Sequence, residues 1–266
     1  MEIKKILEKL ARGQITVATA EQELRLYSIE YVENNLAKID PLREARSAKP
    51  EVILAQGKQY KDLFKIIRAT VSGKKFAVVS KVSPEYMKKI CKEFEKQEFK
   101  IYRGINTLLI SSRQYKFPKR NGRVGVLCAG TSDIKIAEEA KTMAEVMGSK
   151  TVTEYDVGIA GIHRTIKAVA NMIKSKVHVI VVVAGMEGAL ASFVSSVTDI
   201  PVIGVPTSIG YGYGSDGIAA LASMLQTCSM GMTVVNIDNG IGAGAFAAMV
   251  ANKMSNESKN SDNEDL

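Results

Sequence analysis

The sequence predicts an α/β protein in which a C-terminal, flavodoxin-like doubly wound parallel sheet follows a smaller N-terminal α+β domain. From residue 123 onward, short β-branched runs alternate strictly with helical segments, which is typical of a parallel sheet covered by helices on both faces. Each run ends at a turn rich in glycine. The third run, Val177–Val183, is apolar apart from His178, as a strand buried on both faces should be. Five such strands suit a flavodoxin-like order, with ligands outside the carboxyl ends of the strands.

The C-terminal elements follow from these runs and from the helical spacing between them. Strands are expected over Arg123–Cys128, Thr151–Asp156, Val177–Val183, Val202–Val205 and Thr233–Ile237. Helices are expected over Ile134–Met147, Arg164–Lys174, Gly188–Val197, Ile218–Thr227 and Ile241–Met254. The last helix is rich in small residues (Ala243, Ala245, Ala247 and Ala248), which indicates close packing, including packing between subunits.

The sequence of the N-terminal domain contains few candidate catalytic or binding residues. Residues up to about Pro41 have helical spacing, and a short strand follows at Glu51–Leu54. The remaining elements are a helix around Tyr60–Ile67, a strand at Lys75–Val79, a helix at Ser83–Phe94 and further strand within Phe99–Ile110. This order predicts a small α+β domain.

Composition shifts mark the domain boundaries. Residues 111–122 contain Pro118 and a cluster of basic residues, which is typical of a linker. We therefore predict an N-terminal domain over residues 1–112, a linker over 113–122 and a catalytic domain over 123–254. Residues 255–266 are polar apart from the last and are predicted to be disordered.

Composition also narrows the function. The longest apolar run is far too short to span a bilayer, and the N-terminus lacks the apolar core of a signal peptide, so a cytoplasmic location is expected. The net charge of +8 suits anionic ligands, but no zinc finger, recognition helix or Arg/aromatic interleaving indicates nucleic-acid binding. Three scattered cysteines are too few for a disulfide framework or a metal cluster.

Polar and glycine residues follow every predicted C-terminal strand, and these loops meet at one edge of the sheet. The first loop, Gly130–Asp133, combines small residues with a helix N-terminus, which suits a phosphate or carboxylate; the simpler interpretation is an N-cap by Ser132 or Asp133. Candidate binding residues are Gly130, Thr131, Ser132, Asp133, Asp156, His163, Arg164, Gly185, Met186, Thr207, Ser208, Tyr211, Asn236, Asp238 and Asn239.

Several common catalytic motifs are absent. No G-x-G-x-x-G follows the first strand, and Walker A is missing, which disfavours dinucleotide-dependent dehydrogenases and P-loop enzymes. A lone G-x-G-x-x-G over residues 212–217 comes after the fourth strand, where it is a weak signal. No nucleophile elbow and no H-E-x-x-H occurs.

Two residues stand out as candidates for chemistry. Glu187 is the one charged residue in the turn after the most buried strand, where it could cap the next helix or act as a general base. Cys228 follows a helix; by pattern alone it is more often a buried core thiol. The partial negative charge of a helix C-terminus also disfavours a thiolate, so catalysis there needs a compensating positive charge.

Ordered sequence strings now indicate a family. Gly130–Asp133 and Gly188–Pro206 are similar to the carboxylases and mutases that act on aminoimidazole ribonucleotide, although their catalytic histidine has no counterpart in Met186–Ala189. Five further strings resemble pyridinium-3,5-biscarboxylic acid mononucleotide synthases: Asp156–Arg164, Gly185–Ala189, Pro206–Gly212, Met224–Gly231 and Val235–Ala243. Pro50–Ile53 and Gly57–Lys58 extend the resemblance to the N-terminal domain. Ala191 departs from it where proline is expected.

The resemblance implies a reaction that supplies the nickel-pincer nucleotide cofactor of lactate racemase. Nicotinic acid adenine dinucleotide is carboxylated on its pyridinium ring by CO2 or bicarbonate, and its phosphoanhydride is hydrolysed to release AMP. Cys228 is then the nucleophile that adds to the ring, and Glu187 is the candidate base. The cationic ring would supply the positive charge that the helix end lacks. The family also implies Mg2+, with ligands that the sequence does not identify, and a homo-oligomer.

Two other interpretations stay open. One is an aminoimidazole ribonucleotide carboxylase or mutase, which the missing histidine disfavours and which would not depend on Cys228. The other is a non-catalytic nucleotide-binding module, which would be favoured if Cys228 were buried among aliphatic side chains without an adjacent cavity.

Overall fold

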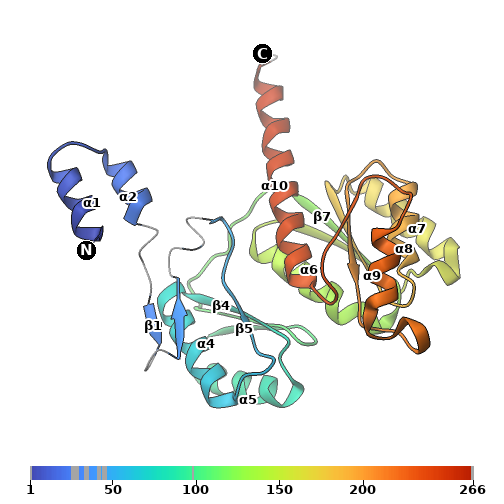
Figure 1. Cartoon of the computed structure of the whole chain (residues 1–266), viewed down its shortest axis with the longest axis horizontal. Coiled ribbons are helices and arrows are strands. Elements are labelled where there is room, and N and C mark those ends of the chain that lie inside the picture. Colours follow the sequence, from blue (N-terminus) through green and yellow to red (C-terminus); the bar gives the residue numbers. More distant parts are fainter. Residues whose placement is uncertain are drawn as a thin grey trace. The chain divides into compact units, whose positions relative to one another are not determined.

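The computed structural model describes residues 2–24, 30–32, 36–40, 43, 47–97 and 99–264. It divides into two compact units, residues 1–115 and 116–266, so the division falls inside the segment predicted to be a linker. Figure 1 labels the elements of both. Each unit is described by itself below.

The first unit begins with two short helices, α1 (Glu2–Ala11) and α2 (Val17–Leu24). The next elements are strands, β1 (Glu30–Val32) and β2 (Ala37–Ile39), which pair antiparallel. The helical prediction up to Pro41 is therefore wrong after residue 29. Val32 and Ile39 are buried, so the pairing gives these β-branched residues an apolar environment that outweighs the weak helical spacing.

The rest of the first unit is a four-stranded sheet with two helices. The sheet order is β3–β4–β6–β5, with β3 and β4 parallel and the other pairs antiparallel. The bounds are β3 (Val52–Leu54), α4 (Tyr60–Lys74), β4 (Phe76–Ser80), α5 (Pro84–Glu95), β5 (Lys100–Arg103) and β6 (Leu108–Ser111). The core packs Leu63 and Ile67 of α4 and Ile90 and Phe94 of α5 against the sheet. The α+β prediction for this unit is confirmed.

The second unit is a five-stranded parallel sheet in the order β11–β10–β9–β7–β8. Its strands are β7 (Arg123–Cys128), β8 (Lys150–Glu154), β9 (Val179–Ala184), β10 (Val202–Pro206) and β11 (Met232–Val234). Counting from β7, this is the order 2-1-3-4-5, so the predicted flavodoxin-like fold is confirmed. The strand order reverses between β7 and β9, which makes the carboxyl ends of these two strands the switch point of the sheet.

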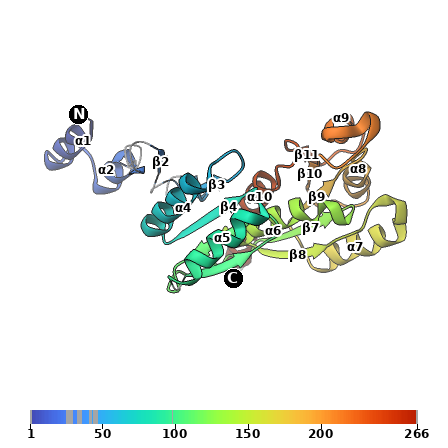
Figure 2. The same ribbon diagram turned by 90° about the horizontal axis from the view of Figure 1, so that it is seen from below.

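Helices cover both faces of this sheet (Figures 1 and 2). Helices α7 (Ile162–Lys174), α8 (Ala189–Ser196) and α9 (Ile218–Leu225) pack on one face. Helices α6 (Ile134–Val146) and α10 (Gly240–Glu264) pack on the other and contact one another along their length. The central strand β9 is buried at every position, as its apolar sequence predicted.

Small residues let α10 approach α6 closely. Ala243, Ala247 and Ala248 are buried inside the chain, and a Cβ on Gly244 would collide with the carbonyl oxygen of Ala140 in α6. The small-residue stripe is therefore used for packing within the chain. The helix also continues to Glu264, through most of the segment predicted to be disordered. No glycine or proline follows Gly244, so nothing in the sequence terminates the helix.

No helix in the described part of the chain is both long and apolar enough to cross a membrane.

Candidate functional site

A cavity of about 490 Å3 opens at the carboxyl edge of the second sheet, at its switch point. Three loops line it, those that follow β7, β8 and β9, together with one residue of the loop after β10. The lining residues are Ala129, Gly130, Thr131, Ser132, Asp133, Asp156, Gly158, Ile159, Ala160, Ala184, Gly185, Met186, Glu187, Ala189, Leu190 and Ile209. This is where the fold class predicts a ligand site.

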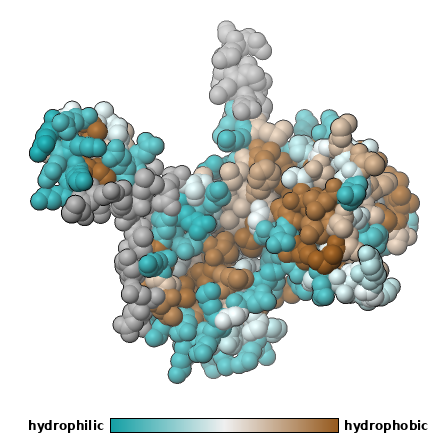
Figure 3. Space-filling view, viewed as in Figure 1, coloured by the Kyte–Doolittle hydropathy of each residue, from teal (hydrophilic) through white to brown (hydrophobic). Residues whose placement is uncertain are grey.

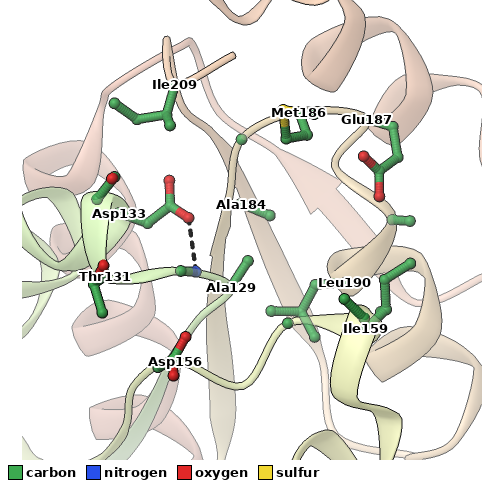
Figure 4. Close-up of a pocket in the computed structure, with 16 residues that line it drawn as sticks. Ala129, Thr131, Asp133, Asp156, Ile159, Ala184, Met186, Glu187, Leu190 and Ile209 are labelled. Atoms are coloured by element: carbon green, nitrogen blue, oxygen red, sulfur yellow. Dashed lines mark hydrogen bonds between the residues drawn. The ribbon is translucent and has the colours of Figure 1, made fainter. Parts of the chain in front are cut away.

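The loop after β7 places a buried carboxylate against the cavity. Asp133 is 4% exposed and ends the short helical turn Thr131–Asp133. One carboxylate oxygen accepts a hydrogen bond from the backbone N–H of Gly130 at 3.0 Å, and the other accepts one from the hydroxyl of Thr207 at 2.6 Å (Figure 4 draws the first). Burial raises the pKa of Asp133, and these hydrogen bonds partly offset the shift. Asp133 therefore joins the β7 loop to the β10 loop.

The loop after β8 brings a second carboxylate to the rim. Asp156 has a φ of +59°, which is uncommon for a residue other than glycine. Its carboxylate accepts a hydrogen bond from the Arg164 guanidinium at 2.6 Å, and both side chains are about half exposed. Arg164 lies in the first turn of α7 and is thereby held beside the cavity without lining it. Its position suits an anionic part of a ligand outside the cavity.

The loop after β9 is the tightest of the three. A Cβ on Gly185 would collide with the carbonyl oxygen of Ile209 and the hydroxyl of Thr207, so only glycine lets the two loops meet. Met186 follows with a φ of +53°, a strained value for a bulky side chain of the kind found at functional sites. These two residues set the direction in which Glu187 leaves the strand.

Glu187 is the third carboxylate of the cavity. It is exposed, and the helix that follows, α8, is capped by Gly188 without any side-chain hydrogen bond to the cap. The capping role that the sequence left open for Glu187 is therefore not seen. Figure 4 shows Glu187 across the cavity from Asp133 and Asp156, with Leu190 and Ile159 on its own side. A carboxylate in this position is available to act on a bound ligand.

The loops after β10 and β11 support the cavity and contribute little to its lining. Ser208 donates hydrogen bonds to Asp238 from both its backbone N–H, at 2.9 Å, and its hydroxyl, at 2.6 Å. Asn239 accepts a hydrogen bond from the N–H of Gly242 and so caps the start of α10. With the Thr207–Asp133 hydrogen bond, these contacts connect the loops after β7, β10 and β11 into one network.

The charged side chains that line the cavity are all acidic. Its lining has three carboxylates, Asp133, Asp156 and Glu187, and within the described structure none of its lining residues is lysine, arginine or histidine. The remaining lining is mostly apolar, with Ile159, Leu190 and Ile209 as its largest side chains. An acidic cavity with apolar walls favours a ligand that carries a positive charge and also has a flat or apolar surface.

The three cysteines occupy different environments. Cys91 is buried in the core of the first unit, and Cys128 is buried at the end of β7, where burial raises its pKa to about 11. Cys228 is exposed. The prediction from pattern alone, that Cys228 is a buried core thiol, is therefore wrong, and Cys228 is the cysteine accessible to a reagent or substrate.

Cys228 and the cavity lie at opposite edges of the sheet. Cys228 follows α9 and precedes β11, and its neighbours bond to elements of the amino edge. The carbonyl of Met230 accepts a hydrogen bond from Ser195 at the end of α8, and the carbonyl of Gly231 accepts one from Val202 at the start of β10. Glu187, in contrast, follows the carboxyl end of β9. Within one chain the two candidate catalytic residues are separated by the length of the strands.

The structure thus brings together about half of the predicted site. Gly130, Thr131, Ser132, Asp133, Asp156, Gly185, Met186 and Glu187 line the cavity. Arg164 reaches it through Asp156, and Thr207, Ser208 and Asp238 belong to the supporting network. His163, Tyr211, Asn236, Asn239 and Cys228 do not line it. His178 accepts a hydrogen bond from the backbone of Arg123, a structural role at the amino edge.

Apolar lining residues were missed by the sequence reasoning. Ile159, Leu190 and Ile209 form the walls, yet the prediction collected only glycine and polar residues from the same loops. The available signal was their position: each lies within a few residues of a strand end that had already been assigned to the site.

Comparison with known proteins matches both units of this chain to known families. The family described as AIR carboxylase matches residues 123–264, just over half of the chain. A second family, described as LarB/PurE-like N-terminal domain, matches residues 31–108. Together the two matches cover most of both units.

Three individual proteins are similar to this chain. An uncharacterized protein of Methanocaldococcus jannaschii is 43% identical over 257 residues, covering 95% of this chain and 98% of that protein. An N5-carboxyaminoimidazole ribonucleotide mutase of the same organism is 35% identical over 127 residues, covering 47% of this chain and 74% of that protein. The crystal structure of a PurE2 variant from Treponema denticola has 19% identity and a TM-score of 0.36, covering 55% of this chain and 98% of that one.

Proposed function

Because this chain belongs to the AIR carboxylase family, we propose that it is a carboxylase that acts on the pyridinium ring of a nucleotide. Its substrate in this proposal is nicotinic acid adenine dinucleotide, with CO2 or bicarbonate as co-substrate. The ring gains a second carboxyl group and the phosphoanhydride is hydrolysed to release AMP. The product is pyridinium-3,5-biscarboxylic acid mononucleotide, the precursor of the nickel-pincer cofactor.

The charge of the cavity is the observation that carries this proposal. A pyridinium ring is flat, apolar on its faces and positively charged. The cavity has apolar walls, the carboxylates of Asp133 and Glu187, and a third carboxylate, Asp156, that is paired with Arg164 at the rim; none of its described lining residues is basic. A cation in such a site is stabilised by the nearby carboxylates, whereas an anionic phosphate there would be repelled. The phosphates fit better outside, toward Arg164 at the rim.

The chemistry of a pyridinium requires a nucleophile before carboxylation. The ring is electron-poor and cannot attack CO2. A thiolate that adds to the carbon para to nitrogen makes an enamine, whose neighbouring carbon attacks CO2 and forms the new carbon–carbon bond. A base then removes the proton from that carbon, and expulsion of the thiolate restores the aromatic ring.

The residues for these steps are Cys228 and Glu187. Cys228 is the exposed cysteine of the chain, while Cys128 stays protonated because its pKa is about 11. Asp156 and Glu187 are both exposed carboxylates of the cavity, but Asp156 is paired with Arg164, whereas the Glu187 side chain does not cap α8 within the described structure. It is therefore the carboxylate best placed to take the ring proton.

Magnesium is not assigned to protein ligands. Within the described residues no group of three or more His, Cys, Asp or Glu side chains is placed to hold a metal ion. Both oxygens of Asp133 already accept hydrogen bonds, and Asp156 is paired with Arg164. The residues therefore do not fit a protein-held Mg2+ site, and no step above uses one.

A second candidate is the conversion of aminoimidazole ribonucleotides. The mutase from Methanocaldococcus jannaschii, at 35% identity, favours it. Against it, neither histidine of this chain lines the cavity; His178 is held at the amino edge, and His163 lies on α7. The non-catalytic interpretation is favoured by a Cys228 that is buried and has no adjacent cavity; Cys228 is exposed, but it is not among the residues that line the cavity.

The test incubates the purified protein with nicotinic acid adenine dinucleotide, bicarbonate and Mg2+ and determines the masses of the products. We expect a mononucleotide that has gained one carboxyl group, together with an equal amount of AMP. A parallel incubation with N5-carboxyaminoimidazole ribonucleotide tests the second candidate. No carboxylated pyridinium product in the first incubation would overturn the proposal, and turnover only in the second would replace it with the mutase.

A further inference from the structure

The three carboxylates that line the cavity differ in their exposure to water. Asp133 is buried, with 4% of its surface exposed. Asp156 and Glu187 are exposed, and Asp156 is paired with Arg164. A charge acts more strongly on a ligand from a low-dielectric interior than from a position surrounded by water. Asp133 is therefore the carboxylate with the largest expected effect on a cation in this cavity.

Burial also opposes the charge of Asp133. Removal from water favours the neutral acid and is the main reason why the pKa of Asp133 is raised; the nearby Asp238 carboxylate raises it further. The other titratable groups around it do not offset this shift, because Asp156 and Glu187 are acidic and Cys128, with a pKa of about 11, is neutral. None of the described lining residues is basic. The charge of Asp133 therefore depends on hydrogen-bond donors.

Donors from three loops surround the Asp133 carboxylate. The backbone N–H of Gly130 donates to one oxygen at 3.0 Å, and the hydroxyl of Thr207 donates to the other at 2.6 Å. A backbone hydrogen bond from Gly185 also lowers the pKa of Asp133. An ionised carboxylate only accepts hydrogen bonds, so all three donors favour the charged form. Two of these donors are backbone groups, and the Thr207 hydroxyl is the one that depends on the identity of a side chain.

The surroundings of Thr207 direct its hydroxyl to Asp133. Thr207 is fully buried directly after β10. Its backbone N–H donates to the carbonyl of Ala184 at 3.0 Å, which fixes it to the end of β9. A Cβ on Gly185 would lie 2.7 Å from the Thr207 hydroxyl, so glycine at that position leaves the space that the hydroxyl occupies. The 2.6 Å separation from Asp133 is typical of a hydrogen bond to a charged oxygen.

From these contacts we propose that Thr207 is a positioning residue that holds Asp133 as an ionised carboxylate, so that the cavity selects a positively charged ring over a neutral ring of similar size. The inference rests on the proposed function, because a pyridinium is the ligand whose charge is selected. The neutral competitor is the same dinucleotide with its ring in the 1,4-dihydro form. That ring has no positive charge and does not accept a nucleophile para to nitrogen, so a site that bound it equally well would be blocked.

The first test measures how pH affects binding of nicotinic acid adenine dinucleotide, by calorimetry. In Thr207→Val a methyl group replaces the hydroxyl, so Asp133 loses a donor and is protonated at higher pH. The pH below which binding weakens should rise by roughly one to two units, the effect of losing a hydrogen bond to a charged group. Thr207→Ser keeps the donor and should follow the wild-type profile. The ligand's own groups titrate alike in every variant, so the difference between profiles reports the protein.

The second measurement uses the 1,4-dihydro form of the same dinucleotide. At a pH where Asp133 is ionised in wild type and protonated in Thr207→Val, the variant should bind the oxidised form about 10-fold more weakly. Binding of the reduced form should change by less than about twofold, because its ring has no charge for Asp133 to stabilise. Thr207→Ala removes the same donor and is expected to show the same loss of selectivity, which keeps the test available if Thr207→Val does not fold.

A double-mutant cycle shows whether Thr207 acts through Asp133. Adding Thr207→Val to Asp133→Asn should not weaken binding of the oxidised form further, since the charge is already absent. Thr165→Val is the matched control: Thr165 is another fully buried threonine, and its hydroxyl donates to the carbonyl of Val157 at 2.7 Å instead of to a carboxylate. Its pH profile should match wild type. Circular dichroism checks the fold of each variant.

The outcomes separate this inference from the proposed function. Wild-type protein that neither binds nor carboxylates nicotinic acid adenine dinucleotide overturns the proposed function. If wild type carboxylates it, a Thr207→Val variant that weakens both ring forms alike, or weakens binding equally at every pH, overturns the role of Thr207 and leaves the proposed function standing. Additive losses in the double-mutant cycle would overturn it as well.

Discussion

The carboxyl edge of the second sheet and the exposed apolar surface around α9 (Figure 3) are opposite in character. We call this surface the α9 face; it consists of Tyr211, Tyr213, Ile218, Leu225 and Met230. The carboxyl edge carries three carboxylates, close-packed glycines and two non-glycine residues, Asp156 and Met186, with positive φ. The α9 face is a regular helix with exposed apolar side chains and a single charge nearby. Strained backbone and concentrated charge cost stability, and a protein tolerates them where they perform chemistry.

The proposed function gives these two regions different roles. In the proposed function the carboxyl edge binds and deprotonates a cationic ligand, and its described lining has no thiol. The α9 face has no binding features, yet the accessible thiol, Cys228, lies at its end. The predictions below test each side of this division, from the largest expected effect to the smallest.

Removing the thiol should have the largest effect. Cys228→Ala is expected to reduce pyridinium carboxylation by about 10⁴-fold or more, as losses of a covalent nucleophile do in other enzymes. The fold should be unchanged, because Cys228 is exposed. Product formation is measured by mass spectrometry and folding by circular dichroism. Ser229→Ala is the neighbouring control and should keep activity; full activity of Cys228→Ala would remove the covalent mechanism.

Neutralising the base should have the next largest effect on the carboxylation rate. Glu187→Gln is expected to lower the carboxylation rate by about 10²- to 10⁴-fold, the range for loss of a general base. Addition of the thiol to the ring does not need this base, so the adduct should still form and can be followed by the loss of pyridinium absorbance. Asp199→Asn, an exposed aspartate at the amino edge, is the control. An unchanged rate in Glu187→Gln would exclude Glu187 as the base.

The smallest effect concerns Asp133 and is a dependence of stability on pH. Its pKa is raised by burial, so the folded state holds this proton more tightly than the unfolded state does. The contribution of Asp133 to stability is therefore present below the unfolded pKa and is lost as the pH rises through the folded pKa.

We expect the free energy of unfolding of wild type, relative to Asp133→Asn, to be larger at acidic pH than at neutral pH. Urea unfolding of both proteins at several pH values measures this difference. Asp199→Asn should show no such trend, because Asp199 is exposed. A difference that grows toward neutral pH would show that the hydrogen bonds from Thr207 and Gly130 outweigh burial.

The loops of the site were predictable from sequence because strand alternation dictates which loops share an edge. Gly130–Asp133, Asp156 and Gly185–Glu187 each follow a strand, and all line the cavity. The division of labour among the other loops was not predictable. Thr207 and Asp238 are as polar as the lining residues, and only the hydrogen bonds to Asp133 and Ser208 show that they support the site.

Local sequence determined the elements of the second unit, since each strand and helix has a hydrophobic period that a short stretch of chain expresses by itself. It also marked Glu187 and Cys228 through their surroundings in the family strings. Tertiary structure alone decided that the alanines of α10 pack within the chain, that Cys228 is exposed, and that Cys228 and Glu187 lie at opposite edges of one sheet. The reason is that burial and distance depend on how distant segments pack, and no local pattern records that packing.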